Sequence, residues 1–555
     1  MNASPNSLEF DVPASSKTDR GLLAIYAFYG LLIAAQIFLV FTKSFNWDEF
    51  YHFSMVHDLP KGRLTWDFQT LYIRLFLWVP AVADDLIAQL QIARLGMLCF
   101  ELVAVAMIVR LAREFVDHKA ALITGIVYLA GGYIFTQGFS FRTDPVATAA
   151  LMMALYLFAT KDLTIGRVLA VGVLVGLAGL VTIKSIFFAP CFLAFAIRRL
   201  MDSPAAWRAA ALRIAAVPIV ALLTFVVVLQ LHRIGLDVRA AGVPSLEGWI
   251  SAFLGDGPGE RTTYIFKQME LAPVITAGVL LSLFVVLRLP RRDAVASLGL
   301  LVPLLTLLFY RNTFPYFFVF LLAPVCVGIA PAIALMLQRF GTWIALAVLV
   351  FSPVSLLAEQ RYDVLERQQA LINEVHRLFP QPVGYLAYAG FIADYPRILP
   401  HLISGVGLQG YYDRKIPVIA NEIERGNVAF VLSDSKSVRA GLEGRTMPNS
   451  LQPRDFTMLR ENFVHYQGAI WIAGKTICAS QGEQSVTLYR AGPYSIDGGP
   501  IVIDGVAAEN GSTRILQAGQ HRIVHQNGNC IRLWALPEVP RVPQGYPDGS
   551  LFTLF

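Results

Sequence analysis

Charged residues are scarce in this sequence, and their scarcity decides its broad class. Of 555 residues, 15% are Asp, Glu, Lys or Arg, whereas 55% are hydrophobic. Apolar stretches long enough to cross a bilayer recur through roughly the first two-thirds of the chain, which excludes a protein that is soluble throughout. The formal net charge of +6 is small. It reflects basic residues in one set of connections and gives no reason to expect a nucleic-acid partner.

Cysteine is also rare, with five residues in the chain. Cys99, Cys191 and Cys326 lie in apolar segments, where a thiol acts as a small apolar side chain. Cys478 and Cys530 lie in the polar C-terminal third, which the charge pattern described below places in an oxidising compartment. We therefore expect a Cys478–Cys530 disulfide bond. The alternative is a pair of buried free thiols.

Eleven apolar segments are predicted to cross the membrane as helices. They cover residues 21–41, 90–111, 119–137, 145–160, 167–183, 185–198, 213–231, 272–288, 295–309, 316–337 and 342–358. An odd number places the two termini on opposite sides. Cytoplasmic loops are rich in Lys and Arg, so the cytoplasmic set is predicted to be the one that contains Arg110, Arg113, Arg198, Arg199, Arg291 and Arg292.

This orientation makes the N-terminus cytoplasmic and places the loop at 42–89 and everything after 358 outside. The first twenty residues are polar and show no signal-peptide pattern, so we expect the first segment to be retained. The chain is therefore predicted to be a multi-pass protein of a bacterial inner (cytoplasmic) membrane with a periplasmic C-terminal region. An endoplasmic-reticulum membrane would give the same topology.

Three domains are predicted: a membrane domain at 1–358, an α/β domain at 359–450 and a β-rich domain at 451–555. The α/β domain combines helix-periodic segments at 361–379 and 415–427 with short strands near 383–390 and 427–434. In the β-rich domain, alternating residues between Gly, Asn, Asp and Pro turns indicate a small β-sandwich or barrel. It either binds a glycan through exposed aromatics such as Trp471, Tyr489 or Tyr494, or packs as a lid that buries them.

The regions after residue 358 contain no nucleophile triad, phosphate loop or metal-ligand spacing, so chemistry is expected at the outer end of the bundle, where ionisable residues are costly. Four stretches there carry acids and bases. Their candidate residues are Asp48, Glu49 and His52 in SFNWDEFYHF, followed in the same loop by Tyr72 and Arg74; Arg142 and Asp144 in GFSFRTDPVA; Lys184 in VTIKSIFF; and Tyr310, Arg311 and Tyr316 in FYRNTFPYFF.

Each of these residues taken alone has a structural explanation. The acidic pair suits a helix N-terminus, Arg142 and Asp144 can pair with each other, and Lys184 and Arg311 can extend to lipid head groups. Arg94 and Glu101, seven apart on one helical face, are interpreted as structural. The convergence of the four stretches on one face, with no matching cluster predicted on the other side, favours a functional site.

The order of these stretches along the predicted topology resembles the GT-C glycosyltransferases of the protein-O-mannosyltransferase and lipid A aminoarabinose-transferase type. The resemblance rests on WDEFYH after the first segment, FRTDP between the third and fourth, and the lysine in GLAGLVTIKS at the fifth, and it covers roughly residues 20–358. It implies a polyprenyl-phosphate-linked sugar donor, an acceptor that docks from the outer side, and inversion at the sugar carbon. It also implies that Asp48 matches the catalytic acidic residue and Asp144 the second-loop acidic position.

The chemistry of inverting transfer assigns further roles. A base must take the proton of the attacking hydroxyl, and Asp48 is the expected base. Glu49 is the weaker candidate, because adjacent helical residues point about 100° apart, and Asp144 would lie across the site. Fixed cations stabilise the charge that grows on the departing lipid phosphate. The expected donor-phosphate residues are Lys184, Arg142, Arg311, Tyr310 and Tyr316, and the expected acceptor or sugar residues are His52, Tyr72 and Arg74.

No cofactor is expected to be obligatory. Asp48 and His52 are candidate ligands for a divalent metal, but two ligands are an incomplete set. The expected partners are a polyprenyl-phosphate sugar donor, a glycan, lipopolysaccharide, lipid or protein acceptor, and membrane lipids. Two other classes stay open. A lipid-linked-glycan transporter or flippase should show broken helices or repeated halves, which the sequence does not predict, and a non-catalytic scaffold would leave the loop charges dispensable.

Overall fold

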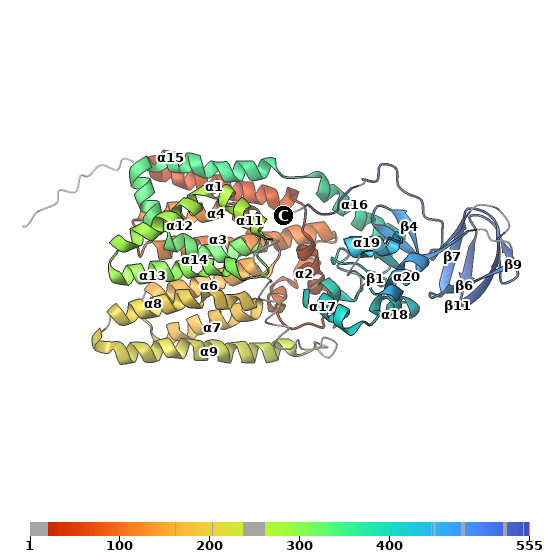
Figure 1. Cartoon of the computed structure of the whole chain (residues 1–555), viewed down its shortest axis with the longest axis horizontal. Coiled ribbons are helices and arrows are strands. Elements are labelled where there is room, and N and C mark those ends of the chain that lie inside the picture. The colour runs from red at the N-terminus through yellow and green to blue at the C-terminus, as the bar shows by residue number, and fades with distance from the viewer. Residues whose placement is uncertain are drawn as a thin grey trace, which may run out of the picture.

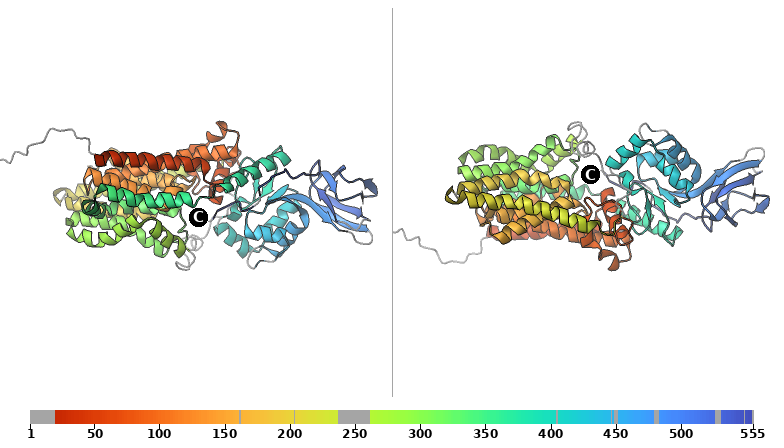
Figure 2. Two further views of the ribbon diagram at one scale, coloured as in Figure 1. Left: turned by 90° about the horizontal axis from the view of Figure 1, so that it is seen from above. Right: turned by 90° about the horizontal axis from the view of Figure 1, so that it is seen from below.

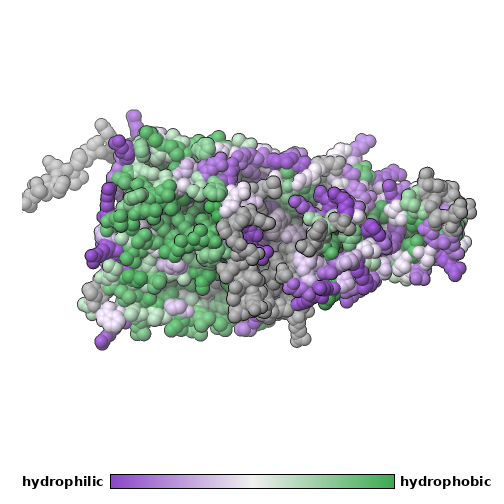
Figure 3. All heavy atoms as spheres, viewed as in Figure 1, coloured by the Kyte–Doolittle hydropathy of each residue, from purple (hydrophilic) through white to green (hydrophobic). Residues whose placement is uncertain are grey.

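The computed structural model describes residues 20–160, 162–202, 204–236, 261–403, 405–445, 447, 451–478, 483–525, 530–547 and 549–553. The N-terminal residues 1–19, expected to be cytoplasmic, lie outside the described residues. A helical bundle occupies one end of the long axis and a region of mixed helices and strands the other (Figure 1). On the face seen in Figure 3, hydrophobic side chains cover much of the bundle, whereas hydrophilic ones gather at the end of the bundle away from the C-terminal region and over the C-terminal region itself.

Most helices of the bundle run roughly along the long axis (Figure 2). They are α1 (Arg20–Thr42), α3 (Leu86–Ala112), α4 (His118–Leu129), α5 (Tyr133–Gln137), α6 (Thr143–Thr160), α7 (Ile165–Val181), α8 (Ala189–Asp202), α9 (Trp207–Arg233), α11 (Thr262–Leu271), α12 (Pro273–Val285), α13 (Arg291–Leu301), α14 (Phe317–Gly328) and α15 (Ala330–Ala358). Short 3-10 helices, η1 (Leu71–Phe76), η3 (Ile183–Phe188) and η7 (Val302–Leu308), join them.

Five of the described helices are long and apolar enough to cross a bilayer on their own: α1, α3, α6, α9 and α15. A sixth crossing results if the bent pair of Thr262–Leu271 and Pro273–Arg288 counts as one, and α4, α7 and α14 are shorter apolar helices. The chain is thus a helical membrane protein with several apolar helices. The predicted number of eleven and the predicted orientation stay predictions.

Several predicted membrane segments are interrupted in the structure. The segment 119–137 breaks at Gly132, which has a φ of 65°, and 316–337 breaks at Ile329. Helix α15 changes direction at Gly341, with a φ of 79°. Glycine is the residue that adopts such positive φ angles at low cost. The apolar composition of a segment indicates that it is buried in lipid or protein, but it does not indicate where the helix breaks.

A broken helix that the sequence does not predict is present in the bundle. Helices α11 and α12 meet at a bend of 94°. On α11, Gln268 accepts a hydrogen bond of 2.8 Å from the Tyr133 N–H and donates one of 3.0 Å to the Gly131 carbonyl. The expectation of unbroken helices is therefore wrong. A polar glutamine flanks this break and ties it to the turn between α4 and α5.

The C-terminal region contains two sheets. An eight-stranded sheet has the order β10-β7-β12-β5-β3-β1-β2, with β4 paired to β5, and a four-stranded sheet has the order β6-β11-β8-β9. The strands are β1 (Tyr385–Leu386), β2 (Arg397–Ile398), β3 (Phe430–Leu432), β4 (Phe463–Gln467), β5 (Ile470–Ile477), β6 (Glu483–Leu488), β7 (Gly492–Asp497), β8 (Ile501–Ile503), β9 (Val506–Ala508), β10 (Thr513–Leu516), β11 (Gly519–Val524) and β12 (Ile531–Trp534).

Helices accompany the first part of this region, as predicted for an α/β unit. They are α16 (Asp363–Leu378), which leads out of the bundle, α17 (Gly405–Arg414), α18 (Val418–Glu424), α19 (Lys436–Leu442) and α20 (Pro453–Asn462). Strand β3 pairs with β5, so one sheet crosses the predicted boundary at 450/451. The division of the chain at 358 and 450 stays a prediction.

The two sheets enclose a shared apolar core at the end of the molecule. Ile496, Ile523 and Ile531 are among its buried residues, and a disulfide bond joins Cys478 and Cys530 at the ends of β5 and β12. Tyr494 is buried, with 2% of its surface exposed, and Trp471 is packed against the neighbouring core. These aromatics do not form an exposed face, so the packing alternative suits this part of the chain better than the glycan-binding one.

The C-terminal region is docked on α2 (Trp47–Asp58), the helix that follows α1. On α16, Gln368 accepts from the Phe45 N–H at 3.0 Å and donates to the Phe45 carbonyl at 2.7 Å. The ring of Phe391, in the loop between β1 and β2, lies 4.4 Å from that of Phe50. The Gln368 side chain also donates a hydrogen bond to the carbonyl of Leu551, so a segment near the end of the chain returns to this junction.

Candidate active site

A capping box positions the first turn of α2. The Asn46 side chain accepts a hydrogen bond of 2.7 Å from the Asp48 N–H, and the Glu49 side chain accepts one of 3.2 Å from the Asn46 N–H. Such reciprocal bonds satisfy N–H groups that the helix leaves free. They also fix the directions of Asp48 and Glu49, which project from adjacent positions to different sides.

Glu49 faces a buried arginine of α3. The Nε and Nη2 atoms of Arg94 donate to its carboxylate at 2.8 and 2.7 Å, and the Phe141 N–H donates at 3.0 Å. Burial disfavours the charge on Glu49, but Arg94 outweighs it and holds the pKa of this carboxyl below its usual value. Arg94 also donates to the carbonyl of Lys43 at 2.7 Å. Glu49 thus joins α2, α3 and the turn before α6, which makes it a poor candidate for the base.

Asp48 belongs to a different cluster, formed by two acids and two bases. Its carboxylate pairs with Arg142, and Arg142 Nε lies 3.5 Å from Asp144 Oδ2. Asp144 also pairs with Lys184. All four side chains are buried. Asp48 comes from α2, and Lys184 from η3. Arg142 directly precedes α6 and Asp144 lies in its first turn, so the cluster joins three separate connections with a formal charge of zero.

An aromatic wall lies against the two bases. The Arg142 guanidinium carbon is 3.3 Å from the centre of the Tyr316 ring, and Lys184 Nζ is 5.7 Å from it. Lys184 Nζ is also 5.9 Å from the rings of Phe317 and Phe320 on α14. Cations are attracted to ring faces at these distances. The wall holds the orientation of the guanidinium and covers the two bases with buried rings.

His52 and Tyr72 lie beside the cluster. Their rings are 5.8 Å apart, and both His52 Nδ1 and Tyr72 Oη are buried without a hydrogen-bond partner in the described part of the chain. Burial lowers the pKa of His52 to about 4, with Asp144 raising it and Lys184 lowering it. Buried polar atoms usually have partners, so these two atoms are unusual in this respect.

Two other predicted site residues, Arg74 and Arg311, are exposed, whereas Tyr310 packs next to the aromatic wall, with its ring centre 4.8 Å from that of Phe317. Arg74 is exposed and donates to His232 on α9, at 2.8 Å to Nδ1 and 3.1 Å to the carbonyl. Arg311 is exposed in the turn before α14. Tyr310 packs against Phe187, with ring centres 5.2 Å apart. The sequence singles out the stretches that contain Arg74 and Arg311, but it does not indicate the direction of either side chain.

One residue near the cluster has no signal in the sequence analysis. Arg397, on the two-residue strand β2, lies over the Tyr51 ring with its guanidinium carbon 4.9 Å from the ring centre. It is buried, with 7% exposed, and it lowers the pKa of His52 further. A lone arginine in an α/β segment gives no hint that it reaches a membrane loop far back in the sequence.

No group of three or more His, Cys, Asp and Glu side chains that could hold a metal ion occurs among the described residues. The carboxylate of Asp48 is paired with Arg142. Asp48 and His52, the two candidate metal ligands, therefore do not form a ligand set in this arrangement.

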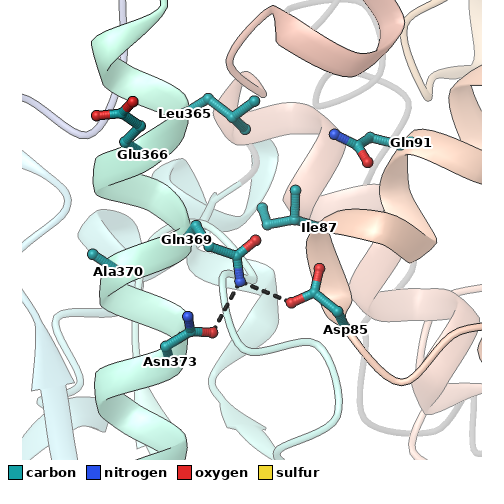
Figure 4. Close-up of a pocket in the computed structure, with 8 residues that line it drawn as sticks. All are labelled: Asp85, Ile87, Gln91, Leu365, Glu366, Gln369, Ala370 and Asn373. Atoms are coloured by element: carbon teal, nitrogen blue, oxygen red, sulfur yellow. Dashed lines mark hydrogen bonds between the residues drawn. The ribbon is translucent and has the colours of Figure 1, made fainter.

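A surface groove of about 480 Å³ lies elsewhere, between α3 and α16 (Figure 4). Gln369 donates there to Asp85 at 2.8 Å and to Asn373 at 2.9 Å. Its lining residues are Asp85, Ile87, Gln91, Leu365, Glu366, Gln369, Ala370 and Asn373. The lining contains no basic side chain, so the groove is unsuited to a phosphate and is distinct from the charged cluster.

The structure of the chain is similar to solved structures of known proteins, although its sequence matches none of the curated ones. No protein-family profile and no sequence among the curated proteins matches the chain. A solved structure of ArnT from Cupriavidus metallidurans bound to undecaprenyl phosphate matches with a TM-score of 0.55 at 14% identity, over 76% of this chain and 95% of that one. The apo structure of the same protein gives 0.51 at 11% identity, over 77% and 95%.

An oligosaccharyltransferase from Archaeoglobus fulgidus in the apo form matches more loosely. Its TM-score is 0.47 at 14% identity, over 79% of this chain and 73% of that one. The ArnT match extends over the bundle and into the C-terminal region. It confirms, at the level of the fold, the resemblance that the order of the loops predicts: the chain has the fold of ArnT.

Proposed function

We propose that this protein is an inverting glycosyltransferase that moves a sugar from a polyprenyl-phosphate donor to an acceptor at the α2 end of the bundle. The observation that carries the proposal is the buried cluster in which Arg142 bridges Asp48 and Asp144 and Lys184 holds the far side. Burying four charges is costly even when they are paired, and such clusters gather at functional sites. The ArnT fold, solved with undecaprenyl phosphate in that relative, supports a lipid phosphate as the sugar carrier.

The bases of the cluster suit the leaving group. The sugar phosphate of the donor is a diester with one negative charge, and departure of the sugar gives a monoester with a second charge. Arg142 and Lys184 have carboxylate partners in this structure, and the same donors can bond phosphate oxygens once the donor is bound. Their fixed positions beside the growing charge stabilise the transition state more than the ground state.

Asp48 is the proposed base. As the acceptor hydroxyl attacks the anomeric carbon, its proton passes to the Asp48 carboxylate, and the bond between the carbon and the phosphate oxygen breaks with its electron pair going to that oxygen. Asp144 lies deeper and pairs with Lys184 and Arg142, so its proposed role is to orient these cations. His52 and Tyr72, with unpartnered polar atoms, are proposed to bind the sugar or acceptor.

We place the α2 end on the periplasmic side of a bacterial inner membrane. The support is the set of arginines at the opposite end, since basic residues favour the cytoplasmic side. One of them is Arg198 on α8, which pairs with Asp293 on α13 at 3.2 Å. A disulfide bond in the C-terminal region is in keeping with an oxidising compartment on the other side.

The decisive experiment compares purified wild type with Asp48→Asn in lipid, each given a panel of labelled polyprenyl-phosphate sugars and a crude outer-envelope extract as acceptor. The exposed Asp363→Asn on α16 is the matched control. We expect wild type and the control to transfer label from one donor and Asp48→Asn to lose at least about 100-fold. Equal turnover by all three would exclude Asp48 as the base. If wild type moves labelled lipid between leaflets without releasing the sugar, the flippase alternative is correct instead.

A further inference from the structure

A buried positive charge lies at the junction between α2 and the C-terminal region. Arg397 is 7% exposed, and its Nε atom is buried without a partner in the described part of the chain. One donor of the guanidinium makes a long bond of 3.4 Å to the Tyr388 carbonyl, out of five that an arginine carries. A guanidinium in such surroundings is costly unless an anion accompanies it.

The carboxylates around Arg397 have other partners. Asp58 accepts a hydrogen bond from Arg63 at 2.8 Å, and Asp434 accepts from the N–H groups of Tyr388 and Ala389 at 2.8 and 2.7 Å. The charge of Arg397 lowers the pKa of both acids, but neither carboxylate forms an ion pair with it. Among the described residues, therefore, no acid closes an ion pair with Arg397.

The position of Arg397 relates it to the proposed base. Its guanidinium lies over Tyr51, which follows Asp48 by three residues on α2. Residues three or four apart on a helix are neighbours on one face, so Tyr51 and His52 both lie one turn from Asp48. The ring of Tyr51 is 5.3 Å from that of His52. A group held by Arg397 would thus lie next to Tyr51, about one helical turn along α2 from the base.

We infer that Arg397 forms an oxyanion site with which the C-terminal region holds a phosphate or carboxylate group of the acceptor, next to the hydroxyl that Asp48 deprotonates. A planar guanidinium matches the oxygens of either group. Assigning the anion to the acceptor rests on the proposed function, whereas the anion site itself does not. The cluster at Lys184 is already neutral, so the uncompensated charge of Arg397 provides a second, separate attraction for an anion.

Hydrogen exchange tests the site directly in the full-length protein in lipid nanodiscs. Inorganic phosphate and acetate are added separately, each against sodium chloride of equal ionic strength, which controls for screening. We expect at least one oxyanion to slow amide exchange in residues 385–398 and 47–58 of wild type. The same protection should persist in Lys184→Gln, which removes the proposed donor-phosphate contact, and in Arg425→Gln, an exposed arginine paired with Glu422. It should be lost in Arg397→Gln.

Three results would overturn the inference: no protection of wild type by either anion, protection that survives in Arg397→Gln, or protection that disappears in Lys184→Gln. Arg397→Lys retains the positive charge but lacks the planar set of donors, and it serves as a second variant in case Arg397→Gln misfolds. It should bind the protecting anion about 10-fold more weakly than wild type. With an acceptor in hand, Arg397→Gln should raise the acceptor KM by about 10- to 100-fold. Loss of transfer in Asp48→Asn tests the proposed function separately, because it leaves the anion protection in place.

Discussion

Glu49 and Arg94 form a buried ion pair with two hydrogen bonds, at 2.7 and 2.8 Å, and neither side chain is exposed. The residue before it, Asp48, pairs instead with Arg142. Adjacent acids in one helical turn thus have separate partners. We therefore assign Glu49 to architecture and Asp48 to chemistry, and this division can be tested by measuring stability and activity side by side.

Removing one partner of the Glu49–Arg94 pair should destabilise the protein. Glu49→Gln leaves a buried guanidinium without its counter-charge, and such changes cost about 3–5 kcal/mol. Unfolding of the purified protein in detergent should shift accordingly, whereas Asp48→Asn should shift it less and abolish transfer. If Glu49→Gln keeps wild-type stability but loses all transfer, the assignment of Glu49 to architecture is wrong and Glu49 takes part in the chemistry.

Lys184 should matter for the donor phosphate. Lys184→Gln removes a fixed cation from the place where charge grows, so kcat/KM for the donor should fall by about 10²–10³-fold. Lys267→Gln, on α11 and paired with Glu270 and Glu359, is the control and should retain activity. A double variant with Asp144→Asn leaves neither charge buried alone, so it should fold yet stay inactive. Recovery of activity in the double variant would show that Lys184 only neutralises Asp144.

Stability of the C-terminal region should depend on pH through Asp434. Burial raises the pKa of this carboxyl to about 7, although the N–H groups of Tyr388 and Ala389 lower it. Its pKa is about 3.9 in an unfolded chain, so between pH 4 and 7 the folded state retains a proton that the unfolded state loses. Stability is therefore greatest below about pH 4 and falls as the pH rises to about 7, by roughly 4 kcal/mol.

Asp434→Asn should flatten this dependence, since it removes the titrating group. The measurement is the free energy of unfolding from pH 4 to 8 in wild type and variant, compared as a difference curve so that other groups cancel. Asp413→Asn, at an exposed position of α17, should keep the wild-type slope. A difference curve that stays level would mean that Asp434 is ionised throughout this range in the folded protein.

The sequence predicts the helical membrane fold, most strands of the C-terminal region and the loops that meet at the site, because hydrophobic pattern and the placement of charge are local properties. Strands β2 and β4 are not predicted. It also predicts the residue types of the cluster formed by Asp48, Arg142, Asp144 and Lys184. What it does not contain is the direction of each side chain. Glu49 turns to Arg94 on α3, and Arg74 turns outward to His232 on α9, and neither partner is close in sequence.

Contacts between distant segments explain the other differences. The bend between α11 and α12 depends on Gln268 reaching the turn at Gly131, and Arg397 reaches α2 only because β1 and β2 pair beside it. Such contacts arise from the packing of whole elements, and no short stretch of sequence encodes them. Glycines give the clearest local hint of them, because a missing side chain often marks a close approach.

Gly390 marks such an approach, and it gives the last prediction. A Cβ atom placed there would lie 2.7 Å from Ser54 Cβ and 3.0 Å from the Phe50 carbonyl, which is closer than packed atoms tolerate. Gly390→Ala should therefore separate the loop between β1 and β2 from α2 and lower transfer activity, with faster amide exchange in both segments. Gly410→Ala, on α17 with nothing within 4 Å of its added Cβ, supplies the same chemical change without a clash. If the two variants behave alike, the docking of the C-terminal region on α2 is not needed for activity, and the acceptor must be held by the bundle alone.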